Sequence, residues 1–240
     1  MAISSDLPPI DTTKMERVGG QLGSNPAGIF QDPSGKRYYV KTLESAAHAR
    51  NEWLAAQLYR LAGAPTLTYV ATAAPDQIAT EWLELDKTCI AHLDADERQQ
   101  AQRWFGVHAW TANWDAAGYH GDNQGAAGGR VLTLDVGGAL DFRAQGDPKG
   151  KAFGDRVDEL DLLRTAPDNP HAVALFGRMT PAAIAAAIRV VTQLTDQSIR
   201  ETVIGHGGKP ALAEKMIARK ADMSRRLIAD FAGAIESAEH

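Results

Sequence analysis

The sequence has 240 residues, of which 44% are hydrophobic and 23% are charged, and its formal net charge is −5. This apolar content is enough for a folded core and excludes disorder of the whole chain, and the length fits one large domain or two small lobes. The low pI, near 5.8, argues against general nucleic-acid binding. The single cysteine excludes an intrachain disulfide or a cysteine zinc cluster, and no apolar run is long enough to span a membrane.

Residues 1–17 are predicted to form a flexible N-terminal arm, because Pro8, Pro9 and several Ser, Thr and Asp residues interrupt any apolar pattern. They contain no apolar stretch of the kind that a Sec-type signal peptide needs. We therefore expect the protein in the bacterial cytoplasm, or secreted into a host cell as an effector by a route that recognises a polar N-terminus.

Residues 18–85 are predicted to form a small antiparallel sheet with one helix. The turn-forming sequence Asp32-Pro33-Ser34-Gly35 separates two strand-like segments, which indicates a hairpin. The stretch 44–62 has no Gly or Pro, carries apolar residues at helical spacing and is followed by Gly63, which favours a helix end. The predicted elements are a glycine-rich turn at 19–28, strands at 29–30, 37–43, 66–72 and 77–83, and a helix at 44–62.

Residues 86–240 are predicted to be mainly helical. Asp94 and Glu97 match the capping-box pattern, and Pro181 follows a threonine that would cap a helix. The predicted elements are helices at 95–112, from 180, from 195 and over 211–236, an irregular glycine-rich stretch at 118–129, and a strand at 131–134. The expected fold class is therefore α+β with two lobes, a connector at 84–88 and a cleft between the lobes.

The glycine-rich turn and Lys41 could together bind phosphates. Glycine allows backbone N–H groups to approach a phosphate closely, and a lysine on the next strand would neutralise its charge. Glu52 lies on the inward face of the following predicted helix and is a natural partner for Lys41, with Glu44 as a rival. The alternatives are a plain hairpin loop with a surface lysine and a solvated helix glutamate.

A second group of polar residues lies in the helical part. Asp115 follows a predicted helix, Asp122 and Asn123 lie in the next loop, and Asp135 ends an apolar strand just before two glycines. Mg²⁺ prefers oxygen ligands and keeps several waters, so one Asp and one Asn beside nucleotide phosphates suffice to hold it. The remaining Asp can accept the proton of a hydroxyl nucleophile, which is the division of roles that phosphoryl transfer needs. The alternative is a set of Asx turns and helix caps.

These features, taken in order along the chain, resemble the protein-kinase-like fold. Asn113-Trp114-Asp115, Gly121-Asp122-Asn123 and Leu134-Asp135-Val136-Gly137 are similar to segments of the atypical subgroup that includes HipA-type toxin kinases and type II phosphatidylinositol 4-kinases. Ala49-Arg50-Asn51-Glu52 and Phe142-Arg143-Ala144-Gln145-Gly146 resemble motifs of kinase-like domains in bacterial effectors, polymorphic toxins and phage head-associated proteins. The resemblance covers about residues 18–165.

The resemblance implies ATP and Mg²⁺ as cofactors and assigns roles to individual residues. It implies that Lys41 contacts the phosphates, that Glu52 positions Lys41 and that Asp115 is the catalytic aspartate. Asn123 and Asp135 would hold Mg²⁺. The implied nucleotide contacts are Gly23, Ser24 and Asn25 in the glycine-rich turn, and Glu81 and Leu83 at the adenine edge formed by 81–85.

The sequence also departs from the family pattern. Asp115 and Asn123 are separated by seven residues, where typical kinases have four, and Asp-Val-Gly replaces Asp-Phe-Gly. Either the loop carries an insertion or Asp122 takes the role assigned to Asp115. Candidate substrate contacts are His120 and Asp122 in this loop, and Arg143 and Lys149 in the segment after Asp135, which is alternatively a solvated loop.

The function that these features favour is ATP- and Mg²⁺-dependent phosphotransfer to a hydroxyl of a protein or a phosphoinositide. A non-catalytic pseudokinase that only binds a partner is the alternative from a different class. A small-molecule kinase resembling the aminoglycoside phosphotransferases is a third possibility, although the helical part is short for one. The oligomeric state is not specified by the sequence.

Overall fold

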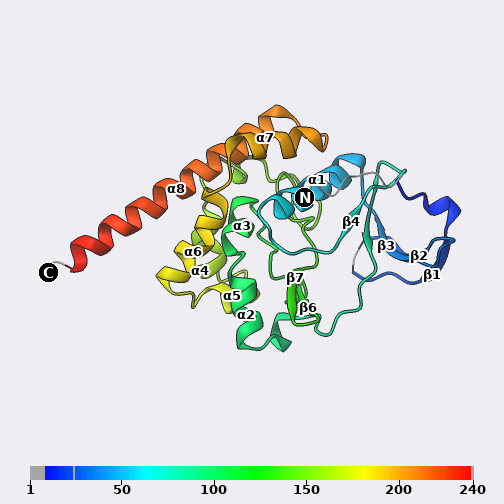
Figure 1. The fold of residues 1–240 in the computed structure, drawn as a ribbon, viewed down its shortest axis with the longest axis horizontal. Coiled ribbons are helices and arrows are strands. Elements are labelled where there is room, and N and C mark those ends of the chain that lie inside the picture. The colour runs from blue at the N-terminus through cyan, green and yellow to red at the C-terminus, as the bar shows by residue number, and fades with distance from the viewer. Residues whose placement is uncertain (1–8, 24, 239–240) are drawn as a thin grey trace.

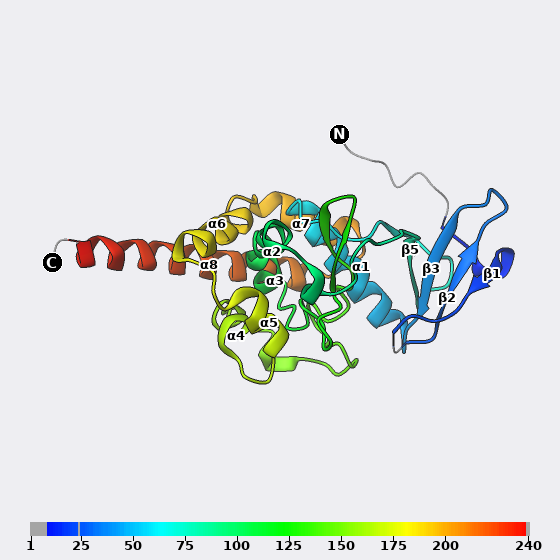
Figure 2. The same cartoon turned by 90° about the horizontal axis from the view of Figure 1, so that it is seen from below.

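Short strands build a five-stranded antiparallel sheet in the first lobe of the computed structural model, which describes residues 9–23 and 25–238. The strands are β1 (Glu16–Gly19), β2 (Ala27–Gln31), β3 (Arg37–Thr42), β4 (Tyr69–Val70) and β5 (Gln77–Glu81), in the order β1-β2-β3-β5-β4. The predicted hairpin turn joins β2 to β3, and Asp32 Oδ1 accepts hydrogen bonds from the backbone N–H groups of Ser34 and Lys36 there. Figure 2 shows this sheet at one end of the molecule.

One helix, α1 (Ala46–Leu61), follows β3, as predicted. Ser45 caps it by accepting hydrogen bonds from the N–H groups of Ala47 and His48. Leu58 and Tyr59 on α1 are fully buried in the main core, which otherwise consists largely of residues from the second lobe. The sheet has a separate small core around Tyr38, Val40 and Ala79. Helix α1 is therefore fixed to the second lobe while it carries Glu52 toward the sheet.

The second lobe is mainly helical and ends in a long helix that projects from the body (Figure 1). Its helices are α2 (Ala95–Gln102), α3 (Phe105–Trp110), α4 (Glu159–Thr165), α5 (Pro170–Phe176), α6 (Pro181–Thr192), α7 (Asp196–Gly205) and α8 (Pro210–Ala238). A two-stranded hairpin, β6 (Gln124–Ala127) and β7 (Arg130–Thr133), lies between α3 and α4 in the chain. Three short 3-10 turns occupy Thr12–Lys14, Ile90–His92 and Gly150–Ala152.

The predicted helix 95–112 is divided in the structure into α2 and α3. Helix α2 ends at Gln102 and α3 begins at Phe105, and within α3 a Cβ on Gly106 would lie 2.2 Å from the backbone oxygen of Ala187. Helix α3 thus packs with its backbone directly against α6, an approach that local sequence does not specify. Among the helices and strands, four were not predicted: β1, α4 and α5, which are short, and β6, which lies in the stretch expected to be irregular.

The predicted arm is wrong for the part that the structure describes. The N–H of Ile10 donates to the backbone oxygen of Ala71 at 2.9 Å, and Asp11 caps a 3-10 turn. Residues 16–19 then pair with β2 as the edge strand β1. Residues 1–8, the rest of the predicted arm, lie outside the described residues.

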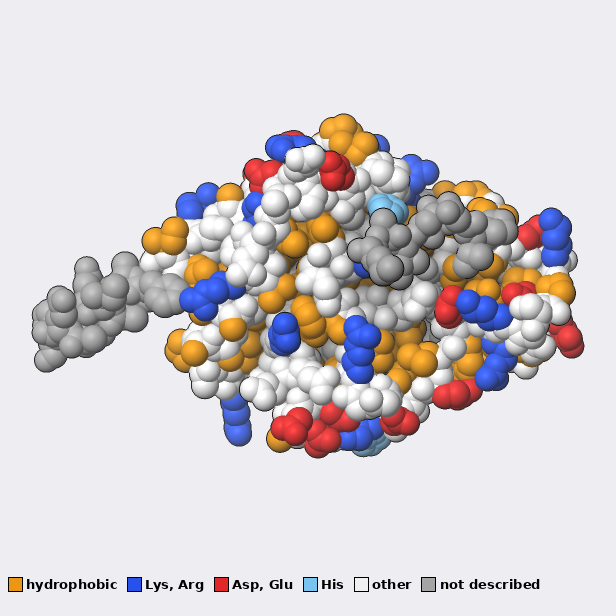
Figure 3. Space-filling model, in the orientation of Figure 1, with side chains coloured by type: hydrophobic (Ala, Val, Ile, Leu, Met, Phe, Trp, Pro, Cys, Tyr) orange, Lys and Arg blue, Asp and Glu red, His pale blue; other side chains and the backbone are white. Residues whose placement is uncertain are grey.

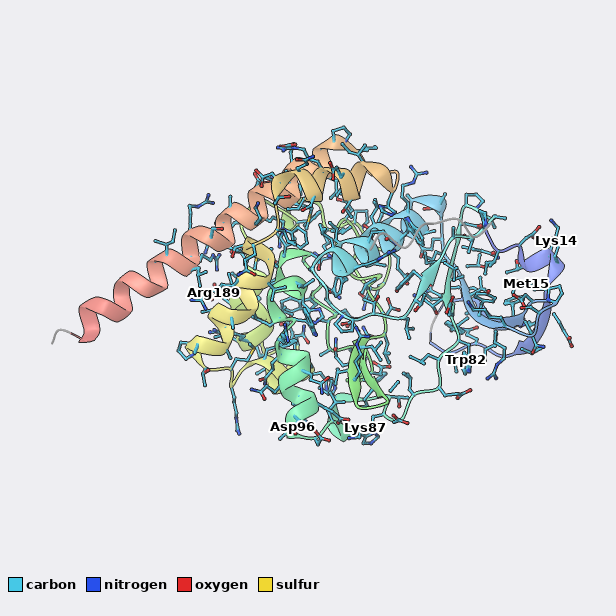
Figure 4. All side chains as sticks on the ribbon, in the orientation of Figure 1. Lys14, Met15, Trp82, Lys87, Asp96 and Arg189 are labelled. Carbon is cyan, nitrogen blue, oxygen red and sulfur yellow. The ribbon has the colours of Figure 1, made fainter. Side chains whose placement is uncertain are left out.

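The connector between the lobes also makes hydrogen bonds and an ion pair with the second lobe. Asp86 and Lys87 both donate backbone hydrogen bonds to the oxygen of Ala126, and the Lys87 ammonium pairs with Glu97 at the start of α2. Figure 4 labels Trp82 where the chain leaves the sheet and Lys87 where it reaches α2.

Within the described residues no single helix has the length and apolar content to cross a membrane, and α5 and α6 meet these criteria only as a pair bent by 103°. On the face drawn in Figure 3, acidic and basic side chains are interspersed.

A buried arginine on α8 is predicted to contribute strongly to stability. Arg219 is fully buried. Its guanidinium donates to the backbone oxygens of Ala109, Trp110, Gly154 and Arg156 and pairs with Glu159 at 2.7 Å. Arg219→Met leaves Glu159 buried without a counter-charge, so we expect the free energy of unfolding in urea to fall by about 3–5 kcal/mol.

The matched control is Arg225→Met on the same helix, because the Arg225 side chain is 70% exposed and pairs with Asp222 at the surface. This variant should lose at most about 1 kcal/mol. Equal losses in the two variants would contradict the structural role assigned to Arg219.

Candidate active site

A lysine from the sheet, a glutamate from α1 and an aspartate after β7 meet between the lobes. Lys41 Nζ lies 2.6 Å from Glu52 Oε1 and 3.1 Å from Asp135 Oδ2. The Lys41 and Glu52 side chains are 13% and 2% exposed. Burial alone would lower the pKa of Lys41, but the carboxylates of Asp135 and Glu52 raise this pKa above its ordinary value. The ammonium is therefore held charged between two acidic groups.

The predicted pairing of Lys41 with Glu52 is confirmed, and the rival partner Glu44 is not used. The Glu44 side chain is 72% exposed and lies 3.9 Å from His48 instead. Glu52 has a second partner besides Lys41: the Tyr69 hydroxyl donates a hydrogen bond to Glu52 Oε1 at 3.0 Å. This role of Tyr69 was not predicted from the sequence, because nothing in the local pattern of β4 distinguishes Tyr69 from an ordinary strand residue.

Two glycines allow the chain after Asp135 to pack closely against the acidic groups. The N–H of Gly137 donates to Asp135 Oδ1 at 2.7 Å. A Cβ on Gly137 would lie 2.9 Å from Glu52 Oε2, and a Cβ on Gly138 would lie 3.2 Å from the Cβ of Asp115. Any larger side chain at either position would push the aspartates or Glu52 apart.

Asp115 and Asn123 meet although seven residues separate them. The Asn123 amide donates to the backbone oxygen of Asp115 at 2.7 Å and to Asp115 Oδ2 at 2.9 Å. The intervening residues form a compact turn in which Gly118 has a φ of +84° and a Cβ on it would lie 2.4 Å from Asp122 Oδ1. The longer spacing in the sequence is therefore absorbed by a tight loop, and Asp115, not Asp122, is the aspartate bonded to Asn123.

The surroundings of Asp115 favour its protonated form. Burial raises the pKa of Asp115 to about 6, with the negative charges of Asp135 and Asp122 adding to the rise and the Asn123 hydrogen bond opposing it. A carboxyl group with this pKa can accept and release a proton near neutral pH, which is the property of a general base.

These groups line one groove of about 740 Å³. Gly23 and Asn25 from the glycine-rich turn border it, so the groove contains side chains or backbone from both lobes. The residues predicted for the site that line it are Gly23, Asn25, Lys41, Glu52, Asp115, His120, Asp122, Asn123, Asp135 and Arg143. Ser24 lies outside the described residues.

Three predicted site residues do not line this groove. Glu81 and Leu83 do not line the groove: Glu81 ends β5 and pairs with Lys36, and Leu83 is exposed. Lys149 lines a neighbouring cavity instead, where it is only 8% exposed and its ammonium donates to the backbone oxygens of Ala112 and Gly138, both at 2.7 Å. Lys149 thus ties the segment before Asp115 to the segment after Asp135.

A second cavity of about 620 Å³ shares Asp115 with the groove. The loop between α4 and α5 forms its far wall with Pro167, Asp168 and Asn169. Asn169 fastens this wall by donating to the backbone oxygen of Trp114 at 2.6 Å. The two spaces share Asp115, Tyr119, Gly138, Arg143, Ala144 and Gln145, so they adjoin and Asp115 borders both.

Asn51 is a further residue whose role the sequence did not specify, although it belongs to the quoted Ala-Arg-Asn-Glu motif. Its amide donates to the backbone oxygen of Ala139 at 2.8 Å, and its oxygen accepts from the N–H of Asp141 at 3.0 Å. It therefore spans Leu140, whose φ of +57° is unfavourable for a residue with a side chain. Asn51, which directly precedes Glu52 on α1, holds the chain after Asp135 in this conformation.

The donor set fits a magnesium ion that arrives with a nucleotide. Asp135 and Asn123 offer oxygen ligands, and the Asn123 amide nitrogen is bonded to Asp115, which leaves its oxygen facing away from that bond. No three His, Cys, Asp or Glu side chains gather as a metal site in the part of the chain that the structure describes. Mg²⁺ held by one or two protein oxygens, phosphates and water needs no such cluster.

Comparison with known proteins identifies the fold. No family model and no curated protein matches the sequence. Among solved structures, the Helicobacter pylori proinflammatory kinase CtkA is 13% identical, with a TM-score of 0.56 over 91% of this chain and 94% of that chain. An aminoglycoside phosphotransferase from Alicyclobacillus acidocaldarius is also 13% identical, with a TM-score of 0.37 over 95% of each chain.

The likeness to CtkA, together with the small antiparallel sheet, the single helix and the helical second lobe, shows that this chain has a protein-kinase-like bilobal fold. The predicted fold class is confirmed. At 13% identity this likeness concerns the fold alone.

The raised pKa of Asp115 leads to a stability prediction. Asp115 binds its proton more tightly in the folded protein than at its ordinary pKa of 3.8, so the free energy of unfolding falls as the pH rises from about 4 to 6 and stays reduced above that range. Asp115→Asn removes this penalty. We expect the variant without ligand to be more stable than wild type at pH 8 by on the order of 1–3 kcal/mol in urea unfolding, and nearly equal to it at pH 4.

Asp155→Asn serves as the control, because Asp155 is exposed and its replacement should change stability little at either pH. An Asp115→Asn variant that is no more stable than wild type at pH 8 would show that the carboxylate is not destabilised by its surroundings.

Proposed function

We propose that this protein is an ATP- and Mg²⁺-dependent phosphotransferase that acts on a hydroxyl acceptor. The observation that carries the proposal is the convergence of Lys41, Glu52, Asp135, Asp115 and Asn123 on one groove between the lobes. A module that only binds a partner has no need for a charged lysine held by two carboxylates beside a second aspartate poised for proton transfer.

The residues divide the work of the reaction among them. Lys41, oriented by Glu52, contacts the nucleotide phosphates, and the Gly23 and Asn25 turn borders the same space. Asp115 orients the acceptor hydroxyl and accepts its proton as the acceptor oxygen bonds to the γ-phosphorus. The bond between the γ-phosphorus and the bridging oxygen breaks, and its electron pair stays with ADP.

Asp135 and Asn123 are the residues that would hold Mg²⁺. When bound, the ion neutralises phosphate charge and orients the nucleotide. The second cavity, which adjoins the groove and also borders Asp115, supports an acceptor approaching from there. The acceptor class that we propose is a hydroxyl of a protein or of a phosphoinositide, with small-molecule hydroxyls such as those of aminoglycosides as the competing class.

Nucleotide binding gives the first test. Adding ATP with Mg²⁺ should raise the melting temperature by several degrees, since a ligand at 100 times its Kd stabilises a protein by about 2.7 kcal/mol. ATP without Mg²⁺ should give a smaller shift, because the carboxylates in the groove then face uncompensated phosphates. No shift in either condition would favour a pseudokinase that does not bind nucleotide.

Turnover gives the second test. Asp135→Ala should lower Mg²⁺-dependent transfer from γ-labelled ATP by at least about 10²-fold while the protein stays folded, because Lys41 keeps Glu52 as its partner. The acceptor panel contains proteins, phosphoinositide vesicles and aminoglycosides. Asp96→Ala at the exposed start of α2 is the control and should retain activity. If Asp135→Ala also retains wild-type turnover, the metal assignment is wrong.

A further inference from the structure

The groove contains more acidic than basic side chains. Its carboxylates belong to Glu44, Glu52, Asp115, Asp122 and Asp135, and its Lys and Arg side chains are those of Lys41 and Arg143. The charge of Lys41 is already engaged by Glu52 and Asp135. A nucleotide triphosphate adds several negative charges to this groove, and Mg²⁺ balances only part of them. Transfer of a phosphoryl group therefore calls for another cation close to Asp115.

Arg143 is placed to supply that cation. It lines both the groove and the second cavity, as Asp115 does. In the described part of the chain its guanidinium has no hydrogen bond or ion pair, so its charge is not engaged by a protein carboxylate. A Cβ on Gly138 would lie 3.2 Å from the Cβ of Asp115 and 3.5 Å from the backbone nitrogen of Ala144. Gly138 therefore lies between Asp115 and Ala144, the residue that follows Arg143 in the chain.

Hydrogen bonds and ring packing hold the loop that carries Arg143 at its base and at its tip. We refer to residues 141–149 as the Arg143 loop. Its base is closed by the hydrogen bond from Lys149 N to Asp141 O and by pairing of Phe142 with Pro148. At its tip, the His48 ring bonds to Gly146 O at 2.9 Å, and the same ring packs on Phe142 with centroids 4.0 Å apart.

The buried Lys149 side chain secures the base of the Arg143 loop to the segments that carry Asp115 and Asp135, through Ala112 and Gly138. The backbone of the loop is thus fixed to α1 and to the two aspartate segments, while the Arg143 side chain itself remains exposed. A fixed backbone with an unengaged guanidinium is the arrangement in which a cation can contact an incoming phosphate without first breaking an ion pair.

We infer that Arg143 is a catalytic residue of the proposed phosphotransferase: its guanidinium contacts the phosphoryl group as that group passes from the nucleotide in the groove to the acceptor in the second cavity. The inference depends on the proposed function and adds the group that balances the charge of the transferred phosphoryl. The planar fork of guanidinium N–H donors matches the oxygens of a phosphoryl group. This role replaces the contact with substrate that the sequence suggested for Arg143.

Hydrolysis of ATP tests the inference without knowledge of the acceptor. Water takes the place of the hydroxyl: its oxygen bonds to the γ-phosphorus, the bond to the bridging oxygen breaks, and the electron pair leaves with ADP. The proton of the water passes to Asp115 and then to solvent, and the products are ADP and inorganic phosphate. An effect of Arg143 on this reaction concerns the phosphoryl group and not the binding of a hydroxyl substrate.

Arg143→Gln should lower kcat for Mg²⁺-dependent ATP hydrolysis by about 10²- to 10³-fold with little change in KM for ATP. Arg143→Lys should fall between this variant and wild type, because it keeps the charge and loses the fork. The matched control is Arg130→Gln, an exposed arginine at the start of β7 that lines neither cavity, and it should hydrolyse ATP like wild type.

A second measurement is independent of activity. ADP, Mg²⁺ and aluminium fluoride together mimic the phosphoryl group in transfer, so they should raise the melting temperature of wild type more than ADP and Mg²⁺ do. Arg143→Gln should keep the shift caused by ADP and lose the additional shift.

The inference is overturned if Arg143→Gln hydrolyses ATP at the wild-type rate and keeps the additional shift. If this variant instead loses only transfer to a protein or lipid acceptor, Arg143 binds the acceptor and the inference is again wrong. A wild-type protein that gains no stability from ATP refutes the proposed function itself, and this result is obtained before any variant is compared.

Discussion

The arrangement of the groove depends on the ammonium of Lys41 between the carboxylates of Glu52 and Asp135. Lys41 and Glu52 are both buried, and a buried charge without a partner is strongly unfavourable, so neither position is tolerable without the other. Asp135 joins from a distant part of the chain at 3.1 Å. One charged cluster thus links the sheet, α1 and the chain after β7 at the place where the two lobes meet.

Helix α1 gives this cluster a rigid support on the second lobe. Leu58 and Tyr59 are buried in the main core, and Asn51 on the same helix holds the chain around Leu140. Glu52 is therefore positioned by the packing of the helical lobe rather than by the sheet. The Arg143 loop is attached to this helix through His48, so the same support extends to the group that we infer to contact the transferred phosphoryl.

Close packing of backbone segments brings the two aspartates to one site. Gly137 and Gly138 leave room for Glu52 and Asp115, and Gly118 permits the tight turn that returns Asn123 to Asp115. Burial raises the pKa of Asp115, and the resulting crowding of carboxylates adds to this rise. The same crowding destabilises the protein without ligand and makes the groove suited to cations and to the phosphates that they accompany.

The sequence by itself determined the elements whose signals are local: the hairpin around Asp32–Gly35, the capped helix α1, the last three helices, and the pairing of Lys41 with Glu52, which follows from one strand leading directly into one helix. Tertiary structure decided the rest. The close packing of α3 on α6 depends on the contact of Gly106 with Ala187, Lys149 is buried because carbonyls from two other segments receive it, and β1 forms because β2 offers an edge. Each of these outcomes depends on groups far away in the sequence, whose distance and direction no local pattern encodes.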